Sequence, residues 1–158
     1  MKYVKITIEQ CAEVIPGFLD QKASETDICV YKAILPSQIT SDGFVSEYGQ
    51  IQRGAIPDML FLHTGDVIIK RLNPDCAVVF EDESVQALPS ANLFVIRPWG
   101  ERLDSYYLAF ILESSNAFCK LSQRSGIGSA VSAVTVSQIR NYEIPLPSLE
   151  QQKKIGEL

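Results

Sequence analysis

Between residues 59 and 96 the chain carries four short apolar runs separated by turn residues, with no helical pattern between them. The runs cover residues 59–62, 67–71, 76–80 and 93–96. They are rich in Val, Ile, Leu and Phe, and glycine, asparagine, aspartate and proline punctuate the intervals. Strands joined by such short turns pair into antiparallel or mixed sheets, whereas a parallel sheet needs a crossover between successive strands. We therefore predict a mixed α/β (α+β) fold around a mainly antiparallel sheet.

The N-terminal segment carries a different pattern. Thr7 and Gln10 have the spacing of a capping box, apolar residues then recur at helical spacing, and Pro16 with the following glycine stops the run, so we predict a helix over residues 7–17. Residues 28–31 form a β-rich run. Residues 36–57 are weakly patterned and are either an irregular excursion or a binding loop.

Helical signals dominate the last third of the chain. Asp104 is a candidate N-cap for a helix with an apolar stripe, and a shorter helix is predicted over residues 117–121. A helical turn is expected over residues 136–139, and residues 144–147 must be extended because each proline disfavours the helical region for its predecessor. Ser148 begins a second capping box that opens a C-terminal helix.

The length and charge of the chain limit its function. The chain has 158 residues, of which 46% are hydrophobic and 21% charged, which is typical of one globular domain and excludes disorder and coiled-coil rods. The formal net charge of −5 argues against a protein that coats nucleic acid or an anionic membrane by charge alone. The net charge does not exclude a small basic face on an otherwise acidic domain.

The cysteines indicate neither a metal site nor a disulfide framework. The four residues are Cys11, Cys29, Cys76 and Cys119, and no two of them form a C-x-x-C pair. A structural zinc site needs clustered ligands, so we expect reduced core thiols, no metal and no cofactor. Neither a signal peptide nor a membrane-spanning apolar run is evident, which predicts a cytoplasmic protein.

Candidate catalytic residues are few. His63 is the only histidine, and no sequence signal gives it a nucleophile or an orienting partner, so a structural or surface role is favoured. Asp66 follows a glycine at a strand entry, which is typical of turn chemistry, and residues 81–83 are interpreted as a solvated acidic turn. We therefore expect no catalytic residue.

One segment stands out by its charge. Residues 114–142 contain Lys120, Arg124 and Arg140 and no acidic residue. Within it, a polar loop offers backbone amides and side chains suited to phosphates or base edges, and its members are Gln123, Arg124, Ser125, Gly126, Gly128 and Ser129. An ordinary polar loop is the alternative. A nucleotide site is weakly supported because the loop lacks a P-loop lysine and a preceding strand.

The C-terminal sequence resembles the DNA-specificity subunit of type I restriction–modification enzymes. Residues 128–129 are similar to the glycine-serine loop of that family, residues 139–147 to its I-x-x-x-x-I-P-L-P stretch, and residues 150–155 to its E-Q-x-K-I helix opening. Residues 62–68 resemble its L-x-x-G-D-V strand. The similarity covers nearly the whole chain and is strongest over residues 128–155.

The resemblance implies a function that the residue spacing does not show. Domains of this family have a strongly twisted sheet and no catalytic residues, and each reads one half of a bipartite duplex DNA site. A partner methyltransferase subunit modifies adenine with S-adenosylmethionine, and a restriction subunit cleaves. The resemblance places a target recognition domain at residues 1–147 and the beginning of a spacer or dimerisation helix at residues 148–158. Family members usually hold two recognition domains, so we expect this chain to be a fragment, a shortened version or a half-subunit.

These considerations give the candidate sites. The DNA-contacting candidates are Lys70, Arg71, Gln123, Arg124, Ser125, Gly126, Gly128, Ser129, Arg53 and Gln52. The partner-binding candidates are Leu149, Gln152 and Ile155, with a second recognition domain as a further partner of the C-terminal helix. Two alternatives are a protein-docking module with little DNA specificity and, less favoured, a small enzyme that uses the Gly126 loop.

Overall fold

The computed structural model describes residues 3–19, 28–40, 43–44, 47–72, 74–114, 120–121 and 133–157. The N-terminal elements are β1 (Val4–Thr7), η1 (Ile8–Gln10), β2 (Ala12–Pro16), β3 (Cys29–Ile34), η2 (Pro36–Gln38), β4 (Ile39–Thr40), β5 (Gly43–Phe44), β6 (Gly49–Arg53) and η3 (Asp58–Leu60). The later elements are β7 (Val67–Lys70), β8 (Ala77–Val79), β9 (Ala87–Pro89), β10 (Leu93–Pro98), α1 (Ser105–Ser114), α3 (Val136–Asn141), β11 (Glu143–Leu146) and α4 (Leu149–Gly156).

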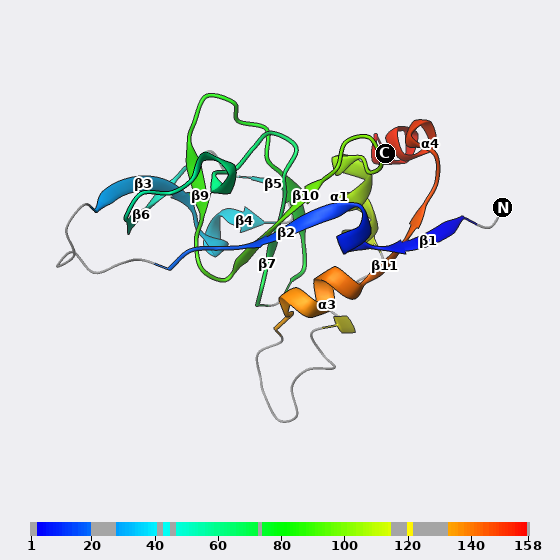
Figure 1. Cartoon of the computed structure of the whole chain (residues 1–158), viewed down its shortest axis with the longest axis horizontal. Coiled ribbons are helices and arrows are strands. Elements are labelled where there is room, and N and C mark those ends of the chain that lie inside the picture. Colours follow the sequence, from blue (N-terminus) through cyan, green and yellow to red (C-terminus); the bar gives the residue numbers. More distant parts are fainter. Residues whose placement is uncertain are drawn as a thin grey trace.

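The largest sheet has four antiparallel strands in the order β2-β10-β7-β8. β10 lies in its interior and pairs along one edge with β2 and along the other with β7 (Figure 1). Both faces of the sheet are covered, because residues 67–69 and 93–96 are buried without alternation. One face packs with α1, and the other belongs to a second core cluster that includes Ile34, Leu62 and Phe80.

A smaller sheet extends from this body. Its order is β6-β3-β9, with β3 antiparallel to β6 and parallel to β9 (Figure 1). A short parallel bridge between Phe18 and Ser90 ties the end of β2 to the residue after β9. The chain after β2 is thereby held beside the smaller sheet.

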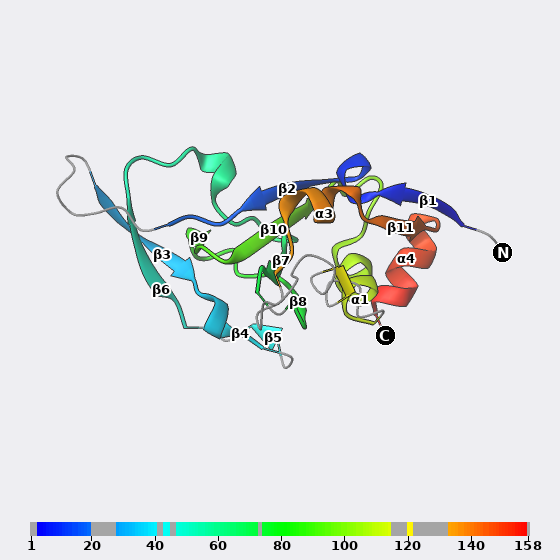
Figure 2. The same cartoon turned by 90° about the horizontal axis from the view of Figure 1, so that it is seen from below.

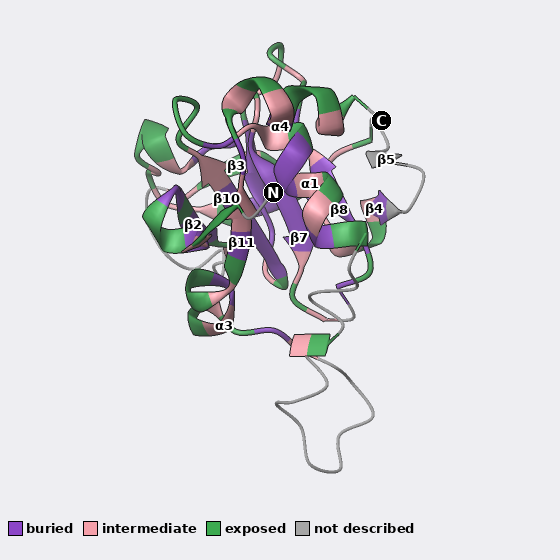
Figure 3. Ribbon diagram, turned by 90° about the vertical axis from the view of Figure 1, so that its right-hand side faces the viewer, coloured by how far each residue is buried: buried purple, intermediate pink, exposed green. Residues whose placement is uncertain are grey.

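The opposite end of the molecule is built from both ends of the sequence. β1 pairs antiparallel with β11, and α4 packs against α1 (Figure 2). The buried strands form the centre of the view in Figure 3, and exposed and half-buried helices surround them. The fold class predicted from the sequence, α+β with mainly antiparallel sheets, is confirmed.

The predicted helix over residues 7–17 is wrong. Gln10 does accept the Thr7 amide, at 2.9 Å, but the helical conformation ends after the single turn η1 and the chain continues as β2. Val14 and Ile15 are β-branched and pair with β10, so sheet formation with a distant segment outweighs the local helical spacing.

Two further expectations need correction. The run 59–62 is not a strand, because its first two residues belong to the turn η3. The carbonyls of Met59 and Phe61 accept hydrogen bonds from Arg97 in place of a neighbouring strand. Residues 36–57 are not simply irregular, because they contain the short strands β4 and β5 and the five-residue strand β6. β6 forms because it pairs with β3, and the local sequence of β6 does not indicate this pairing.

Other local predictions are confirmed. Strands β3, β7, β8 and β10 lie at the predicted runs, and Asp104 caps α1 by accepting the Tyr107 amide at 3.0 Å. The short helix α3, the extended segment of β11 and the helix α4 with its Ser148 cap are also present. Most of the helix predicted over residues 117–121 lies outside the described residues.

Candidate nucleic-acid interface

Lys70 ends β7 and is a half-buried cation. Its Nζ lies 3.4 Å from Asp75 Oδ1, and its side chain is 22% exposed against 65% for the aspartate. The strand fixes the lysine stem, and Asp75 offsets much of its charge. Lys70 therefore contributes less free positive charge than the sequence suggests.

Arg71 follows β7 directly and is exposed. Its Nε and Nη2 both donate to Asn92 Oδ1, at 3.1 and 2.8 Å, and its backbone amide donates to the Asn92 carbonyl at 2.8 Å. Asn92 has a φ of 71°, a left-handed conformation that asparagine tolerates better than most residues. The turn between β9 and β10 therefore holds the arginine in place.

The described residues on both sides of the segment 122–132 are hydrogen-bonded to the rest of the domain, and those that follow the segment are anchored at this arginine. Val134 donates its amide to the Arg71 carbonyl at 2.9 Å, and Ala133 forms an antiparallel bridge with Leu72. Before the segment, the Leu121 carbonyl accepts from Gln138 Nε2 of α3 at 3.2 Å. The fold thus brings the end of β7 to the base of the segment that the sequence singled out.

Other predicted DNA-contacting residues belong to the acid-free segment. Gln123, Arg124, Ser125, Gly126, Gly128 and Ser129 lie outside the described residues. Arg140, from the same acid-free segment, is exposed at the end of α3.

Arg53 and Gln52 lie on the strand β6, not in an irregular loop. The Arg53 guanidinium carbon lies 5.2 Å from the centre of the Phe18 ring, and Nη1 donates to the Leu19 carbonyl at 3.0 Å. Its buried Nε has no hydrogen-bond partner among the residues that are described. Gln52 is exposed and pairs in register with Val30.

A cleft of about 350 Å³ connects these two arginine sites. Its lining comprises Phe18, Leu19, Leu35, Pro36, Gln50, Ile51, Ser90, Ala91 and Asn92. Arg53 contacts the first two of these residues, and Arg71 contacts the last. Two cations from distant parts of the sequence therefore flank one concave surface. The end of β2, the connection from β9 to β10, the end of β7 and α3 follow one another along the lower side of Figure 1.

The sequence did not identify Asn92 or Phe18 as members of this surface. Asn92 occupies a turn after Pro89, Ser90 and Ala91, and asparagine in such a turn signals backbone geometry rather than ligand binding. Phe18 follows Gly17, just after the predicted helix, and its sequence context carries no signal of ligand binding. Both residues gain their role through contacts with remote arginines.

Asp66, by contrast, is part of the structural core. It is 1% exposed and accepts the His63 amide at 2.7 Å. Arg97 Nε and Nη2 donate to its two carboxylate oxygens at 2.8 and 2.9 Å, and this hydrogen bonding raises the pKa of Arg97. The prediction of turn chemistry for Asp66 is confirmed. His63 is exposed and lies 3.4 Å from the Asp58 carbonyl through Nε2.

The acidic turn and the three cysteines that the structure describes form no ligand-binding arrangement. Asp82 accepts hydrogen bonds from Ser84 and Tyr48, which lower its pKa. Burial raises the pKa of the Cys11 and Cys76 thiols to about 11, whereas Cys29 is exposed and so is not the core thiol that was expected. Across the described ranges, no three His, Cys, Asp or Glu side chains are grouped as metal ligands. None of the helices placed in the structure has the length and apolarity needed to cross a membrane.

The partner-binding candidates on α4 differ in accessibility. Gln152 is 1% exposed, donates to the carbonyls of Arg102 and Pro147 at 3.0 and 2.9 Å, and accepts the Asp104 amide at 2.8 Å. Its amide is thus used inside the chain and is not available to a partner. Leu149 and Ile155 are half-buried, and Ile155 packs against the main core cluster.

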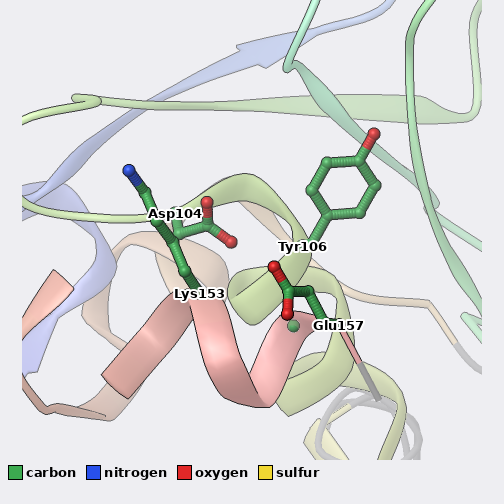
Figure 4. Close-up of a pocket in the computed structure, with 5 residues that line it drawn as sticks. Asp104, Tyr106, Lys153 and Glu157 are labelled. Atoms are coloured by element: carbon green, nitrogen blue, oxygen red, sulfur yellow. The ribbon is translucent and has the colours of Figure 1, made fainter. Parts of the chain in front are cut away.

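A second pocket lies where α4 meets the start of α1. It has a volume of about 410 Å³ and is lined by Asp104, Tyr106, Lys153, Gly156 and Glu157 (Figure 4). Gly156 permits the close contact between the helices, because a side-chain carbon there would lie 2.9 Å from the Tyr107 amide nitrogen. The pocket is a consequence of this packing and contains no group of convergent catalytic side chains.

Comparison with known proteins gives consistent results. Residues 5–158 match the family described as Type I restriction modification DNA specificity domain. Over 101 residues, the chain is 27% identical to a protein of Methanocaldococcus jannaschii described as a type I restriction enzyme MjaX specificity subunit; the match covers 60% of this chain and 23% of that protein.

Solved structures share the fold. A chain from the structure on complex assembly and conformational transition of the type I R-M system has a TM-score of 0.72 at 19% identity. The HsdS subunit from Thermoanaerobacter tengcongensis has a TM-score of 0.71 at 20% identity. The S subunit from M. genitalium has a TM-score of 0.58 at 12% identity. The matches cover 98–99% of this chain but only 38–41% of those chains. The chain therefore spans about two fifths of the solved proteins that it matches.

Proposed function

The chain belongs to the type I restriction modification DNA specificity domain family, and on this premise we propose that it recognises one half of a bipartite duplex DNA site. In this role it performs no chemistry itself. It directs a methyltransferase subunit and a restriction subunit, with which it assembles, to the site that it reads.

One observation supports the DNA-contacting surface most directly. Arg71 is hydrogen-bonded through its carbonyl to Val134, at the base of the segment 122–132, and through its side chain to Asn92, at the edge of the cleft. The sequence had indicated Arg71 and the loop around Arg124 as separate candidates, and it had not indicated Asn92. We propose that Lys70, Arg71, Arg53 and Gln52 contact DNA there together with Gln123, Arg124, Ser125, Gly126, Gly128 and Ser129.

The electrostatics define how such a domain binds. Non-specific affinity for DNA depends on neutralised phosphates, and this chain has a net charge of −5 with Lys70 paired to Asp75. The isolated domain therefore binds DNA weakly, and its binding decreases as the salt concentration rises. The partner subunits supply most of the affinity for phosphates.

The C-terminal helix is proposed to connect the domain to the rest of the assembly. In this proposal residues 1–147 form the recognition domain, and residues 148–158 begin a spacer helix that carries a second recognition domain and a docking surface. Leu149 and Ile155 supply apolar contacts. Gln152 instead fixes the helix to the domain through Arg102, Asp104 and Pro147.

Mapping methylated adenines in cells with and without this chain tests the proposal. We expect one methylation motif to depend on the chain, and we expect Arg71→Ala to change or abolish that motif while the methyltransferase subunit still co-purifies with the protein. An unchanged set of methylated sites after deletion of the chain would contradict the proposal. Co-purification of the methyltransferase without any dependence of its sites on this chain would instead indicate a docking module.

A further inference from the structure

Arg71 has one edge of its guanidinium hydrogen-bonded and the other without an acceptor among the residues that the structure describes. The occupied edge consists of Nε and Nη2, which donate to Asn92 Oδ1. An arginine has five N–H groups in a planar fork, so two on Nη1 and one on Nη2 remain. None of the side chains or carbonyls placed in the structure accepts from these three groups, and Arg71 is exposed.

Asn92 contributes to the same pattern. Its Oδ1 has two lone pairs, and the two hydrogen bonds from Arg71 use both of them. The part of the amide that remains is Nδ2, which is a donor. Arg71 and Asn92 together therefore present only hydrogen-bond donors to an incoming ligand.

We propose that Arg71 reads a guanine in the major groove, donating from Nη1 and Nη2 to the O6 and N7 atoms, and that Asn92 is the residue that positions it. This inference rests on the proposed recognition of duplex DNA. Guanine is the base whose major-groove edge offers two adjacent acceptors. Adenine and cytosine present exocyclic amines, which are donors and would face donors, and thymine offers one acceptor beside a methyl group.

The way in which Arg71 is held favours a base edge over a phosphate. The side-chain contact with Asn92 fixes the plane of the guanidinium, and the backbone is held on both sides by the bonds to Asn92 and Val134. A phosphate accepts hydrogen bonds from many directions and carries no sequence information, so it does not require a fixed plane. A base edge requires a guanidinium with a fixed plane, because both hydrogen bonds lie in the plane of the base.

The neutrality of Asn92 is also informative. A carboxylate in its place would offset the charge of Arg71, as Asp75 does for the neighbouring Lys70. An amide orients the guanidinium and leaves its full charge for the ligand. Charge-assisted, bidentate contacts are the strong ones in such recognition.

Selection of binding sites from a random duplex library, at low ionic strength, tests the inference with the full chain. We expect the wild-type motif to contain a guanine whose preference falls roughly 10- to 100-fold in Arg71→Ala, with the other positions retained. Arg71→Lys keeps the charge but lacks the planar pair of donors, so we expect the preference for the same guanine to be lost. Asn92→Gly preserves the left-handed backbone and removes the acceptor, and we expect a several-fold loss at that one position.

The outcomes separate this inference from the function on which it depends. A motif unchanged by Arg71→Ala, a uniform weakening at all positions, or loss of preference at a base other than guanine would each overturn it while leaving DNA recognition intact. Absence of any motif for the wild-type chain, both alone and assembled with its methyltransferase subunit, would overturn the proposed function itself. Lys154→Ala removes an exposed cation of α4 and serves as the control that keeps the motif. Arg71→Lys supplies the test if Arg71→Ala does not fold.

Discussion

Arg97 and Arg71 are both oriented through two hydrogen bonds from Nε and Nη2, yet the two regions around them use the guanidinium differently. Arg97 pairs with the buried carboxylate of Asp66, and two of its three remaining N–H groups bind the carbonyls of Met59 and Phe61. Arg71 pairs with a neutral amide and is exposed. An arginine most of whose donors are satisfied within the chain stabilises the fold, whereas one that is oriented and keeps donors without an acceptor among the described residues is suited to bind a ligand.

Removing the Arg97 side chain has the largest effect expected from this comparison. Arg97→Ala leaves Asp66 buried without its counter-ion and two carbonyls without their donor, so we expect a loss of roughly 3–5 kcal/mol in the free energy of unfolding. Urea denaturation measures it. A loss below about 1 kcal/mol would show that Arg97 is not the structural counterpart of Arg71.

Gln152 extends the comparison to an uncharged group whose hydrogen bonds are all internal. Gln152→Leu leaves the Asp104 amide and the carbonyls of Arg102 and Pro147 without partners, and we expect a loss of roughly 1–3 kcal/mol. Lys154→Ala, on the exposed side of the same helix, is the matched control and should change stability by less than about 0.5 kcal/mol. Equal effects of the two substitutions would contradict the internal role of Gln152.

The pH dependence of stability tests another internally satisfied group. Tyr107 is buried, donates to the Pro145 carbonyl at 2.6 Å, and has its pKa raised to about 12, mainly by burial. The folded state therefore keeps a proton that the unfolded state loses from about pH 10 upward, so the contribution of Tyr107 to stability is complete below pH 10 and is lost as the pH rises through 12. Tyr107→Phe should cost about 1 kcal/mol at neutral pH and make the alkaline decline shallower. An identical decline in both proteins would show that Tyr107 does not contribute to it.

Arg71→Ala gives the smallest expected change in stability. Its backbone bonds to Asn92 and Val134 remain, and the side chain is exposed, so we expect the free energy of unfolding to change by less than about 0.5 kcal/mol. Thermal and urea unfolding beside the wild type check this. A loss comparable to that of Arg97→Ala would mean that Arg71 serves the fold rather than a ligand.

The sequence predicted those parts of the fold that local signals determine. Strand β7 and the caps at Asp104 and Ser148 depend on neighbouring residues and were found where expected. The helix expected at residues 7–17 failed because its residues match helical spacing while their partner strand β10 lies about eighty residues away.

In the candidate interface, too, local signals identified some residues, whereas contacts between distant residues were not predicted. Charge and family resemblance identified Lys70 and Arg71, but not which of the two is offset by a neighbouring carboxylate. Asn92 lies 21 positions from Arg71 and Gln152 lies 48 positions from Asp104, so neither contact has a signal in the local sequence. Such partners follow from the tertiary structure alone.

Nuclear magnetic resonance of the 17.5 kDa chain, titrated with a duplex that carries its selected site, tests the central claim most directly. We expect the backbone amides of Arg71, Asn92 and Val134 and the Arg71 Nε signal to shift, with the Arg97 Nε signal unchanged. Shifts confined to the pocket between α1 and α4, or equal shifts of both arginine signals, would contradict the assignment of DNA recognition to the surface around Arg71.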